Sequence, residues 1–350
     1  MSHPAGKIIS PTNGVWYKVK KRAPRNRTLT CEEREREQLA SNLITLGGET
    51  SVATLCGRIV NQDFFTAVGF LPAGFVDLLI LDPPYNLSKD YNGQPFHEKS
   101  DSGYREWFRN VVLQLRPILA ADATVYVCSD WKTSILVAPV LQEFFQVRNR
   151  ITWEREKGRG AKSNWKNNTE DIWYCTLSDS YVFNVDAVKL KRKVVAPYRD
   201  ANGKPKDWQE GDDGNYRLTY PSNIWTDITI PFWSMPENTD HPTQKPEKLI
   251  AKLILSSSNE GDFVFDPFLG SGTTAVVAKK LHRHFSGIEQ SVEYCCWAQK
   301  RLSLADADSN IQGYSDGTFW ERNTLSDQKQ TKMVRPSQTM STHPSVLALK

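Results

Sequence analysis

The sequence has few cysteines, and they are not arranged for a disulfide framework or a metal site. Its 350 residues include six cysteines and six histidines. No two cysteines form a C-x-x-C pair, and the histidines do not complete a zinc-type spacing. We therefore expect no bound metal and a reducing, cytoplasmic environment.

Long hydrophobic runs and a strong charge of one sign are also lacking. No apolar run approaches the ~20 residues that span a bilayer, and the amino terminus shows no basic-then-apolar signal pattern. We expect a soluble protein without membrane contact. The 44 Lys and Arg residues nearly balance 40 acidic ones, and a net charge of +4 does not by itself indicate a nucleic-acid partner.

Strand and helix patterns alternate over most of the chain. Residues 75–81, FVDLLIL, form the nearly continuous apolar run typical of a strand buried on both faces of a parallel sheet. Other strands are predicted at 123–128, 148–153, 262–266 and 284–289, with a hairpin of 171–176 and 181–185. Helices are predicted at 104–119, 133–145, 273–281, 291–302 and in a segment opened by Pro246. This alternation predicts an α/β fold with a doubly wound, mostly parallel sheet.

The pattern divides the chain into five parts. Residues 1–50 are a basic and charged extension with a short helix around 31–40, and residues 186–240 break the alternation as an inserted module would. Regular α/β patterning occupies 51–185 and 241–305. Residues 306–350 are rich in Ser, Thr, Gln, Asp and Pro, which predicts a disordered tail.

A glycine-rich turn lies between a predicted strand and a predicted helix. In FDPFLGSGTTA, Gly270, Gly272 and Ala275 match the G-x-G-x-x-G/A spacing that brings backbone close to an adenosine-type ligand. Glu289 closes the next strand, near the ~20-residue spacing at which a carboxylate meets ribose hydroxyls. A nicotinamide dehydrogenase has the same fingerprint, and an ordinary tight turn is the simplest alternative.

Three motifs in a fixed order narrow these alternatives. DPPY at 82–85, HPTQKP at 241–246 and DPFLGSGTT at 266–274 together resemble the S-adenosylmethionine-dependent DNA amino-methyltransferases. With the catalytic motif first, the chain is similar to their circularly permuted beta group, which implies a Rossmann-like methyltransferase fold. By this resemblance 51–185 is the catalytic half, 186–240 the target-recognition region and 241–305 the cofactor-binding half.

The first motif has residues suited to methylation of an exocyclic amino group. That nitrogen is a poor nucleophile because its lone pair is delocalised into the ring. Asp82 would accept one N–H and the carbonyl of Pro83 the other, which directs the lone pair at the sulfonium methyl. Pro83 and Pro84 lack N–H donors and fix φ, while Tyr85 offers a ring on which a base rotated out of the duplex can stack.

The resemblance also supplies candidate cofactor residues. His241, Thr243 and Lys245 of the second motif are expected at the methionine end of S-adenosylmethionine, and Asp63 in NQDFF matches an acid near the cofactor. The glycine segment and the following strand complete the predicted cofactor site with Asp266, Phe268, Gly270, Ser271, Gly272, Thr273 and Glu289. Because ligands bind at the carboxyl ends of parallel strands, Asp82 and Asp266 are expected to face one pocket.

Basic clusters indicate where duplex DNA would bind. Residues 148–166 contain seven Lys or Arg against two Glu, with Trp153 and Trp165 interleaved, and 189–193 read KLKRK. A solvated surface is the simpler interpretation of such runs. The candidate DNA contacts are Lys89, Arg155, Lys157, Arg159, Lys162, Lys191, Arg192 and Lys193. The polar loop at 86–103 is predicted to be a mobile lid that orders over the flipped base.

The resemblance favours adenine N6 as the methylated atom, because relatives acting on cytosine usually have Ser where this chain has Asp82. Cytosine N4 methylation is the close alternative, and a catalytically silent DNA-binding protein or an RNA or protein-amide methyltransferase would also keep the fold. The resemblance further implies a prokaryotic or phage origin. It allows a homodimer and a cognate restriction endonuclease as partners.

Overall fold

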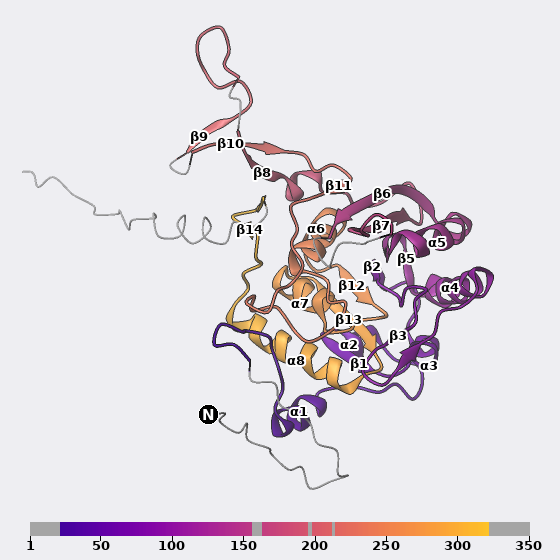
Figure 1. The fold of residues 1–350 in the computed structure, drawn as a ribbon. Coiled ribbons are helices and arrows are strands. Elements are labelled where there is room, and N and C mark those ends of the chain that lie inside the picture. Colours follow the sequence, from indigo (N-terminus) through magenta and orange to yellow (C-terminus); the bar gives the residue numbers. More distant parts are fainter. Residues whose placement is uncertain (1–21, 156–162, 195–197, 212–213, 322–350) are drawn as a thin grey trace, which may run out of the picture.

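The computed structural model describes residues 22–155, 163–194, 198–211 and 214–321. Its centre is an eight-stranded sheet in the order β1-β13-β12-β2-β5-β7-β6-β11 (Figure 1). Only β7 runs antiparallel to its neighbours, so the predicted mostly parallel sheet is confirmed. The strands are β1 (Arg58–Asn61), β2 (Val76–Leu81), β5 (Leu119–Ser129), β6 (Gln146–Glu154), β7 (Thr169–Thr176), β11 (Ile224–Trp225), β12 (Phe263–Asp266) and β13 (His284–Glu289).

Helices cover both faces of this sheet. Successive residues of β2 alternate between two cores: Leu78 and Ile80 pack on one face, Leu79 and Leu81 on the other. The first face is covered by α6 (Glu247–Ser257), α7 (Thr273–Lys280) and α8 (Val292–Ala307), and the second by α4 (Asp101–Leu115) and α5 (Trp131–Phe144) (Figure 1). Short helices α2 (Val52–Leu55) and α3 (Phe64–Ala67) flank β1 in the chain. Burial on both faces explains why the strands read as continuous apolar runs.

The two halves of the chain meet in the middle of the sheet. Strand β12 pairs in parallel with β2, with Val264 opposite Leu78 and Phe265 opposite Leu79. The carboxyl ends of β2 and β12 therefore lie side by side, although their residues are far apart in the chain. This pairing is what the permuted motif order requires of the fold.

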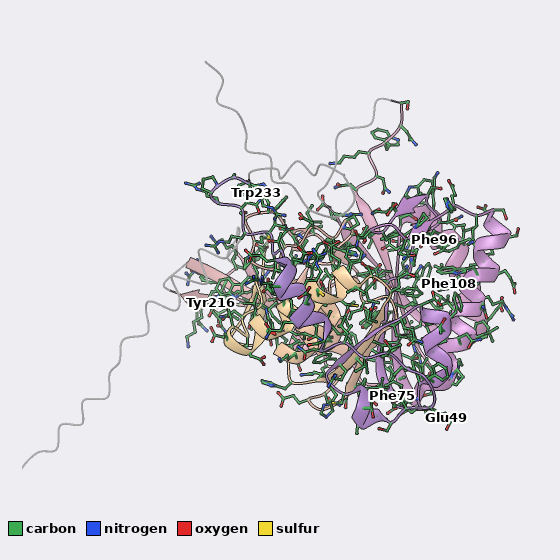
Figure 2. The ribbon with its side chains drawn as sticks, turned by 90° about the horizontal axis from the view of Figure 1, so that it is seen from below. Glu49, Phe75, Phe96, Phe108, Tyr216 and Trp233 are labelled. Carbon is green, nitrogen blue, oxygen red and sulfur yellow. The ribbon has the colours of Figure 1, made fainter. Side chains whose placement is uncertain are left out.

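A second sheet contains most of the module that interrupts the α/β pattern. Its order is β14-β15-β8-β10-β9, with β8 (Leu190–Lys193), β9 (Gln209–Gly211), β10 (Gly214–Thr219), β14 (Tyr314–Ser315) and β15 (Thr318–Trp320). Strands β8 to β10 project from the main body in Figure 1. Figure 2 places Tyr216 of β10 at the opposite end of the molecule from Phe108 of α4.

Three expectations differ from the structure. Residues 181–185 form no strand, because both sides of β7 are already paired, with β5 and with β6; the antiparallel hairpin is β6–β7. The predicted disordered tail is wrong for residues 306–321, since β15 pairs with β8. Pro246 precedes the first helical residue of α6 as its N-cap and does not occupy the first helical position. The remaining tail, 322–350, lies outside the described residues.

The amino-terminal extension contributes one helix to this body. The short helix predicted around 31–40 is confirmed as α1 (Glu33–Ala40), which contacts α8 (Figure 1). Lys300 of α8 donates to the carbonyl of Thr30 and to Glu35. This part of the extension is therefore tied to α8.

Candidate active site

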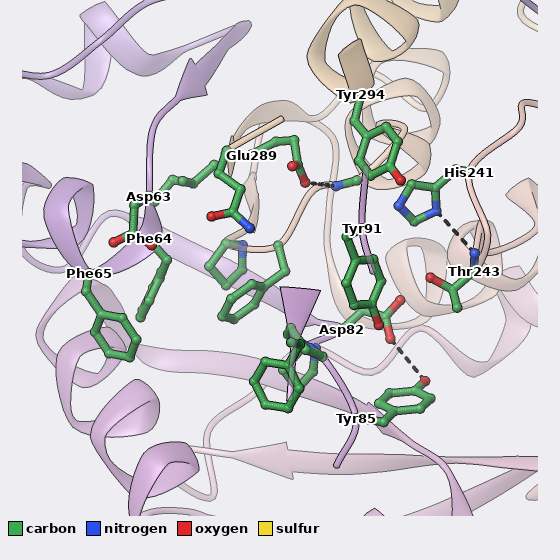
Figure 3. A pocket seen from close by; sticks show the side chains of 18 of the residues that line it. Asp63, Phe64, Phe65, Asp82, Tyr85, Tyr91, His241, Thr243, Glu289 and Tyr294 are labelled. Carbon is green, nitrogen blue, oxygen red and sulfur yellow. Dashed lines mark hydrogen bonds between the residues drawn. The ribbon is translucent and has the colours of Figure 1, made fainter. Parts of the chain in front are cut away.

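The carboxyl ends of the central strands surround a cavity of about 250 Å³. Asp82 directly follows β2, and Glu289 ends β13. The catalytic candidates Asp82, Pro83, Pro84 and Tyr85 all line this cavity. Of the cofactor candidates, Asp63, His241, Thr243, Lys245, Phe268, Gly270 and Glu289 do so as well (Figure 3). Residues from the first and the last third of the chain thus share one cavity.

Four predicted cofactor residues do not line this cavity. Asp266, Ser271 and Thr273 line a smaller adjacent cavity of about 30 Å³, which Asp82 also reaches. Gly272 lines neither cavity. The expectation that Asp82 and Asp266 face one pocket therefore holds only for the small cavity, because Asp266 does not line the large one.

Asp266 stabilises the glycine turn by accepting two hydrogen bonds. Its Oδ1 accepts the N–H of Phe268 at 3.0 Å, and its Oδ2 accepts the hydroxyl of Thr274 at 2.6 Å. Burial raises the pKa of Asp266 to about 7, against the lowering effect of these two hydrogen bonds. Asp266 thus shapes the turn by hydrogen bonds.

The glycine turn needs two left-handed residues. Gly270 has φ 54° and Gly272 has φ 82°, a region that glycine enters without steric cost. The N–H of Gly270 donates to Glu289 Oε2 at 2.9 Å, and the N–H of Ser291 donates to Glu289 Oε1 at 2.7 Å. Burial raises the pKa of Glu289. The acid that the sequence assigns to ribose hydroxyls therefore also fixes the turn.

His241 closes the cavity next to this turn as a neutral side chain. Burial, with the nearby ammonium of Lys245, lowers the pKa of His241 to about 3. Its Nδ1 faces the N–H of Thr243 at 3.4 Å, and its ring packs edge-on against Tyr294 with 4.5 Å between centroids (Figure 3). An uncharged ring at this wall is compatible with a cationic ligand nearby.

Lys245 forms an ion pair with Asp82, the predicted catalytic carboxylate. Its Nζ lies 2.8 Å from Oδ1 and 2.7 Å from Oδ2 of Asp82, and 3.1 Å from the hydroxyl of Tyr85. Although burial lowers the pKa of Lys245, the carboxylates of Asp82 and Glu170 outweigh it and raise that pKa. The contact of Lys245 with the methionine end of a cofactor stays a prediction. The structure shows an ion pair of Lys245 with Asp82, which the motif alone does not reveal.

Hydrogen bonds also hold the DPPY turn in place. The hydroxyl of Tyr85 donates to Asp82 Oδ1 at 3.1 Å, as Figure 3 shows. The hydroxyl of Tyr104, on α4, donates to the carbonyl of Pro84 at 2.8 Å. Because Pro83 and Pro84 fix φ as well, the turn is rigid and its position is determined by α4 and β2.

Sequence reasoning missed most of the aromatic lining of the cavity. The additional wall residues are Gln62, Phe64, Phe65, Tyr91, Phe96, Trp107, Pro267, Ile288, Gln290 and Tyr294. Two of them, Tyr91 and Phe96, belong to the loop predicted as a lid, which forms a small hairpin of β3 (Lys89–Asp90) and β4 (Pro95–Phe96). Aromatic residues within an otherwise polar loop were the available signal.

Comparison with known proteins gives the family. The sequence model of the family described as DNA methylase matches residues 76–300. The chain belongs to this DNA methylase family. It is 30% identical to the DNA adenine methyltransferase YhdJ of Escherichia coli (strain K12) over 77% of this chain and 92% of that protein. It is 32% identical to the Type II methyltransferase M.HpaI of Haemophilus parainfluenzae over 73% of this chain and 76% of that protein.

A solved structure confirms the fold of the DNA methylase. The PvuII DNA methyltransferase (cytosine-N4-specific) superimposes with a TM-score of 0.54 over 81% of this chain and 92% of that chain, at 17% identity. At this identity the likeness concerns the fold alone. The predicted Rossmann-like methyltransferase fold is confirmed.

The predicted DNA contacts of the methylase differ in their surroundings. Arg155 pairs with the buried Glu170. The Nζ of Lys191 lies 3.9 Å from the ring centroid of Tyr216 and 4.1 Å from that of Trp320. The other candidates on described residues are Lys89 in β3, with its ammonium over the ring of Tyr91, and Arg192 and Lys193 in β8. Lys157, Arg159 and Lys162 lie outside the described residues.

Within the described part of the methylase, no group of three or more His, Cys, Asp or Glu side chains could hold a metal ion. None of the helices in that same part is long and apolar enough to cross a membrane.

Proposed function

We propose that this DNA methylase transfers a methyl group from S-adenosylmethionine to the exocyclic N6 of an adenine rotated out of duplex DNA. One observation carries the proposal: Asp82 of the DPPY turn and the glycine turn at Gly270 line the same cavity. An amine-activating carboxylate and a cradle for an adenosine-type cofactor are therefore adjacent.

The cavity has groups suited to each part of the cofactor. Gly270 leaves room for the ring of His241, because a Cβ there would lie 3.0 Å from Nε2 of that ring. Glu289, at the end of β13, would accept hydrogen bonds from the ribose hydroxyls. Phe64 and Phe268, whose ring centroids are 5.1 Å apart, offer apolar surface for the adenine ring. Bound S-adenosylmethionine supplies an electrophilic methyl on a sulfonium.

The chain's own residues would prepare the amine. Asp82 accepts one N–H of the target and the Pro83 carbonyl accepts the other, so that the nitrogen lone pair points at the methyl group. Tyr85 and Tyr91, which both lie beside Asp82 in Figure 3, border the space that the base would enter. Stacking of a base on an aromatic ring contributes about 1–3 kcal/mol, which partly offsets the cost of unstacking it.

Adenine is favoured over cytosine for two reasons. The catalytic motif begins with Asp82, and a relative that is 30% identical over 77% of this chain is named a DNA adenine methyltransferase. Cytosine N4 methylation by the same fold is the alternative that product analysis would reveal. Duplex DNA would contact the small sheet of β8, β9, β10, β14 and β15, so that residues 186–240 serve target recognition. The cytoplasm is the proposed location; a homodimer and a cognate restriction endonuclease stay predictions.

Product analysis tests this proposal. Wild-type protein and Asp82→Ala are incubated with S-adenosylmethionine and unmethylated DNA, which is then digested to nucleosides for mass spectrometry. We expect N6-methyladenine from wild type and none from Asp82→Ala. A matched control is Asp179→Ala, which removes an exposed carboxylate paired with Arg148 and should leave the yield unchanged. N4-methylcytosine would overturn the adenine assignment, and no methylated base would favour the silent DNA-binding protein.

A further inference from the structure

A buried acid outside every sequence motif contacts the catalytic cluster. Glu170 lies in β7, and its side chain is only 4% exposed. Its Oε1 pairs with Nη1 of Arg155, and its Oε2 lies 3.3 Å from Nζ of Lys245 and 3.3 Å from the hydroxyl of Tyr85. A charged carboxylate is rarely buried without partners, so its position beside Asp82 calls for a physical role.

Lys245 and Tyr85 each reach both carboxylates. Lys245 Nζ contacts both oxygens of Asp82 as well as Glu170. The hydroxyl of Tyr85 lies 3.1 Å from Asp82 and 3.3 Å from Glu170, but it has only one proton to donate. The same contacts are therefore compatible with two arrangements of hydrogen bonds. In the first arrangement Lys245 and Tyr85 donate to Asp82, and in the second they donate to Glu170.

The target amino group can bind Asp82 fully only in the second arrangement, in which Lys245 and Tyr85 no longer donate to Asp82. As it stands, Asp82 accepts from Lys245 at both oxygens and from Tyr85 at one of them. A carboxylate has about four lone-pair sites. An incoming amine would have to compete for those of Asp82 with the ammonium of Lys245, whose Nζ lies 2.7–2.8 Å from the two carboxylate oxygens. Hydrogen bonds to charged donors are the stronger ones, so this ammonium must be drawn aside.

We propose, on the basis of the proposed function, that Glu170 is a positioning residue that takes over Lys245 and Tyr85 when the target amino group binds Asp82. No proton or covalent bond is transferred in this exchange; only hydrogen-bond partners change. Lys245 keeps an anionic partner throughout, which avoids leaving an unpaired charge in a buried site. Arg155 holds Glu170 in place from the opposite side.

The test is a kinetic comparison of wild type with Glu170→Gln, a substitution that keeps the size of the side chain and removes its charge. The rate of N6-methyladenine formation is measured on unmethylated DNA, and binding of S-adenosylmethionine is measured by calorimetry. We expect kcat to fall about 10- to 100-fold, the range of a misplaced catalytic group, with cofactor affinity and the KM for DNA within about twofold. Glu170→Asp, which keeps the charge, should recover part of the lost rate.

A double variant separates positioning from simple charge balance. The double variant Arg155→Gln, Glu170→Gln removes one positive and one negative charge. If Glu170 only neutralises Arg155, this variant should have the wild-type kcat. We expect the double variant to stay as slow as Glu170→Gln. Recovery in the double variant, an unchanged kcat in Glu170→Gln, or loss of cofactor binding in that variant would each overturn the inference. Absence of N6-methyladenine from wild type would instead mean that the proposed function fails.

Discussion

Gly272, at the N-cap of α7, lies directly against Ala298 of α8. Its φ is 82°, and a Cβ added there would come within 2.9 Å of Ala298 Cα and closer still to its Cβ. The contact lets α7 and α8 pack tightly behind the glycine turn that lines the cavity. The third position of the turn is thus restricted both by backbone conformation and by space.

Gly272→Ala should therefore destabilise the methylase and distort the turn. We expect a loss of about 2 kcal/mol or more in the free energy of unfolding, since overpacking adds to the cost of left-handed φ. Gly261→Ala is the matched control, because Gly261 has φ 86° but a Cβ added there would lie in open space. It should cost about 1 kcal/mol. Equal losses in the two variants, measured by urea denaturation, would contradict the packing argument.

Asp266 predicts a pH dependence of stability. Its pKa rises from 3.8 to about 7 through burial, so between these values the folded protein binds a proton that the unfolded chain releases. This group's contribution to stability therefore falls as the pH rises from about 4 to about 7. Asp266→Asn cannot titrate and cannot accept from both Phe268 and Thr274. It should be most destabilising relative to wild type near pH 4.5 and least at pH 8.

Urea denaturation of wild type and Asp266→Asn at pH 4.5, 6 and 8 checks this prediction. The difference between the two proteins isolates Asp266 from other titrating groups. A difference that stays constant over the three pH values would mean that the pKa of Asp266 is not raised in the folded state.

The ring and the hydroxyl of Tyr85 should have separable effects. Tyr85→Phe keeps the ring and removes the hydroxyl that contacts Asp82, Glu170 and Lys245. We expect kcat to fall about tenfold, in line with hydrogen bonds to charged groups, with DNA affinity unchanged. Tyr85→Ala also removes the stacking surface, so DNA binding should weaken as well. Equal kinetics of Tyr85→Phe and wild type would show that the hydroxyl contacts are dispensable.

A hydrogen bond joins the β3–β4 hairpin to the start of α8. Asn92 has φ 57°, and its Nδ2 donates to the hydroxyl of Ser291 at 3.2 Å. Asn92→Gly keeps the left-handed backbone and removes this bond, which contributes about 1 kcal/mol. We expect amide hydrogen exchange at residues 89–96 to become about fivefold faster. Added DNA should slow this exchange if the hairpin acts as the predicted lid, and unchanged protection would contradict that role.

Local patterns predicted most elements but not their partners. The apolar run at 75–81 and the strand–turn–helix around Gly270 are confirmed, because burial on both faces and left-handed turns leave clear local signals. Residues 181–185 have a strand-like pattern, yet Asn184 instead hydrogen-bonds to the end of α6 through Ser256 and Ser258. Local alternation cannot reveal that both sides of β7 are already taken.

The sequence by itself determined the three motifs, their permuted order and the strand ends that hold Asp82 and Glu289. Only the tertiary structure decided that Lys245, 163 residues from Asp82, would bind it, and that Glu170 would join them. Motifs encode short-range geometry, whereas these contacts depend on the parallel pairing of β2 with β12 and on the position of β7 in the sheet. Such pairings arise from packing of the whole core, which no single segment contains.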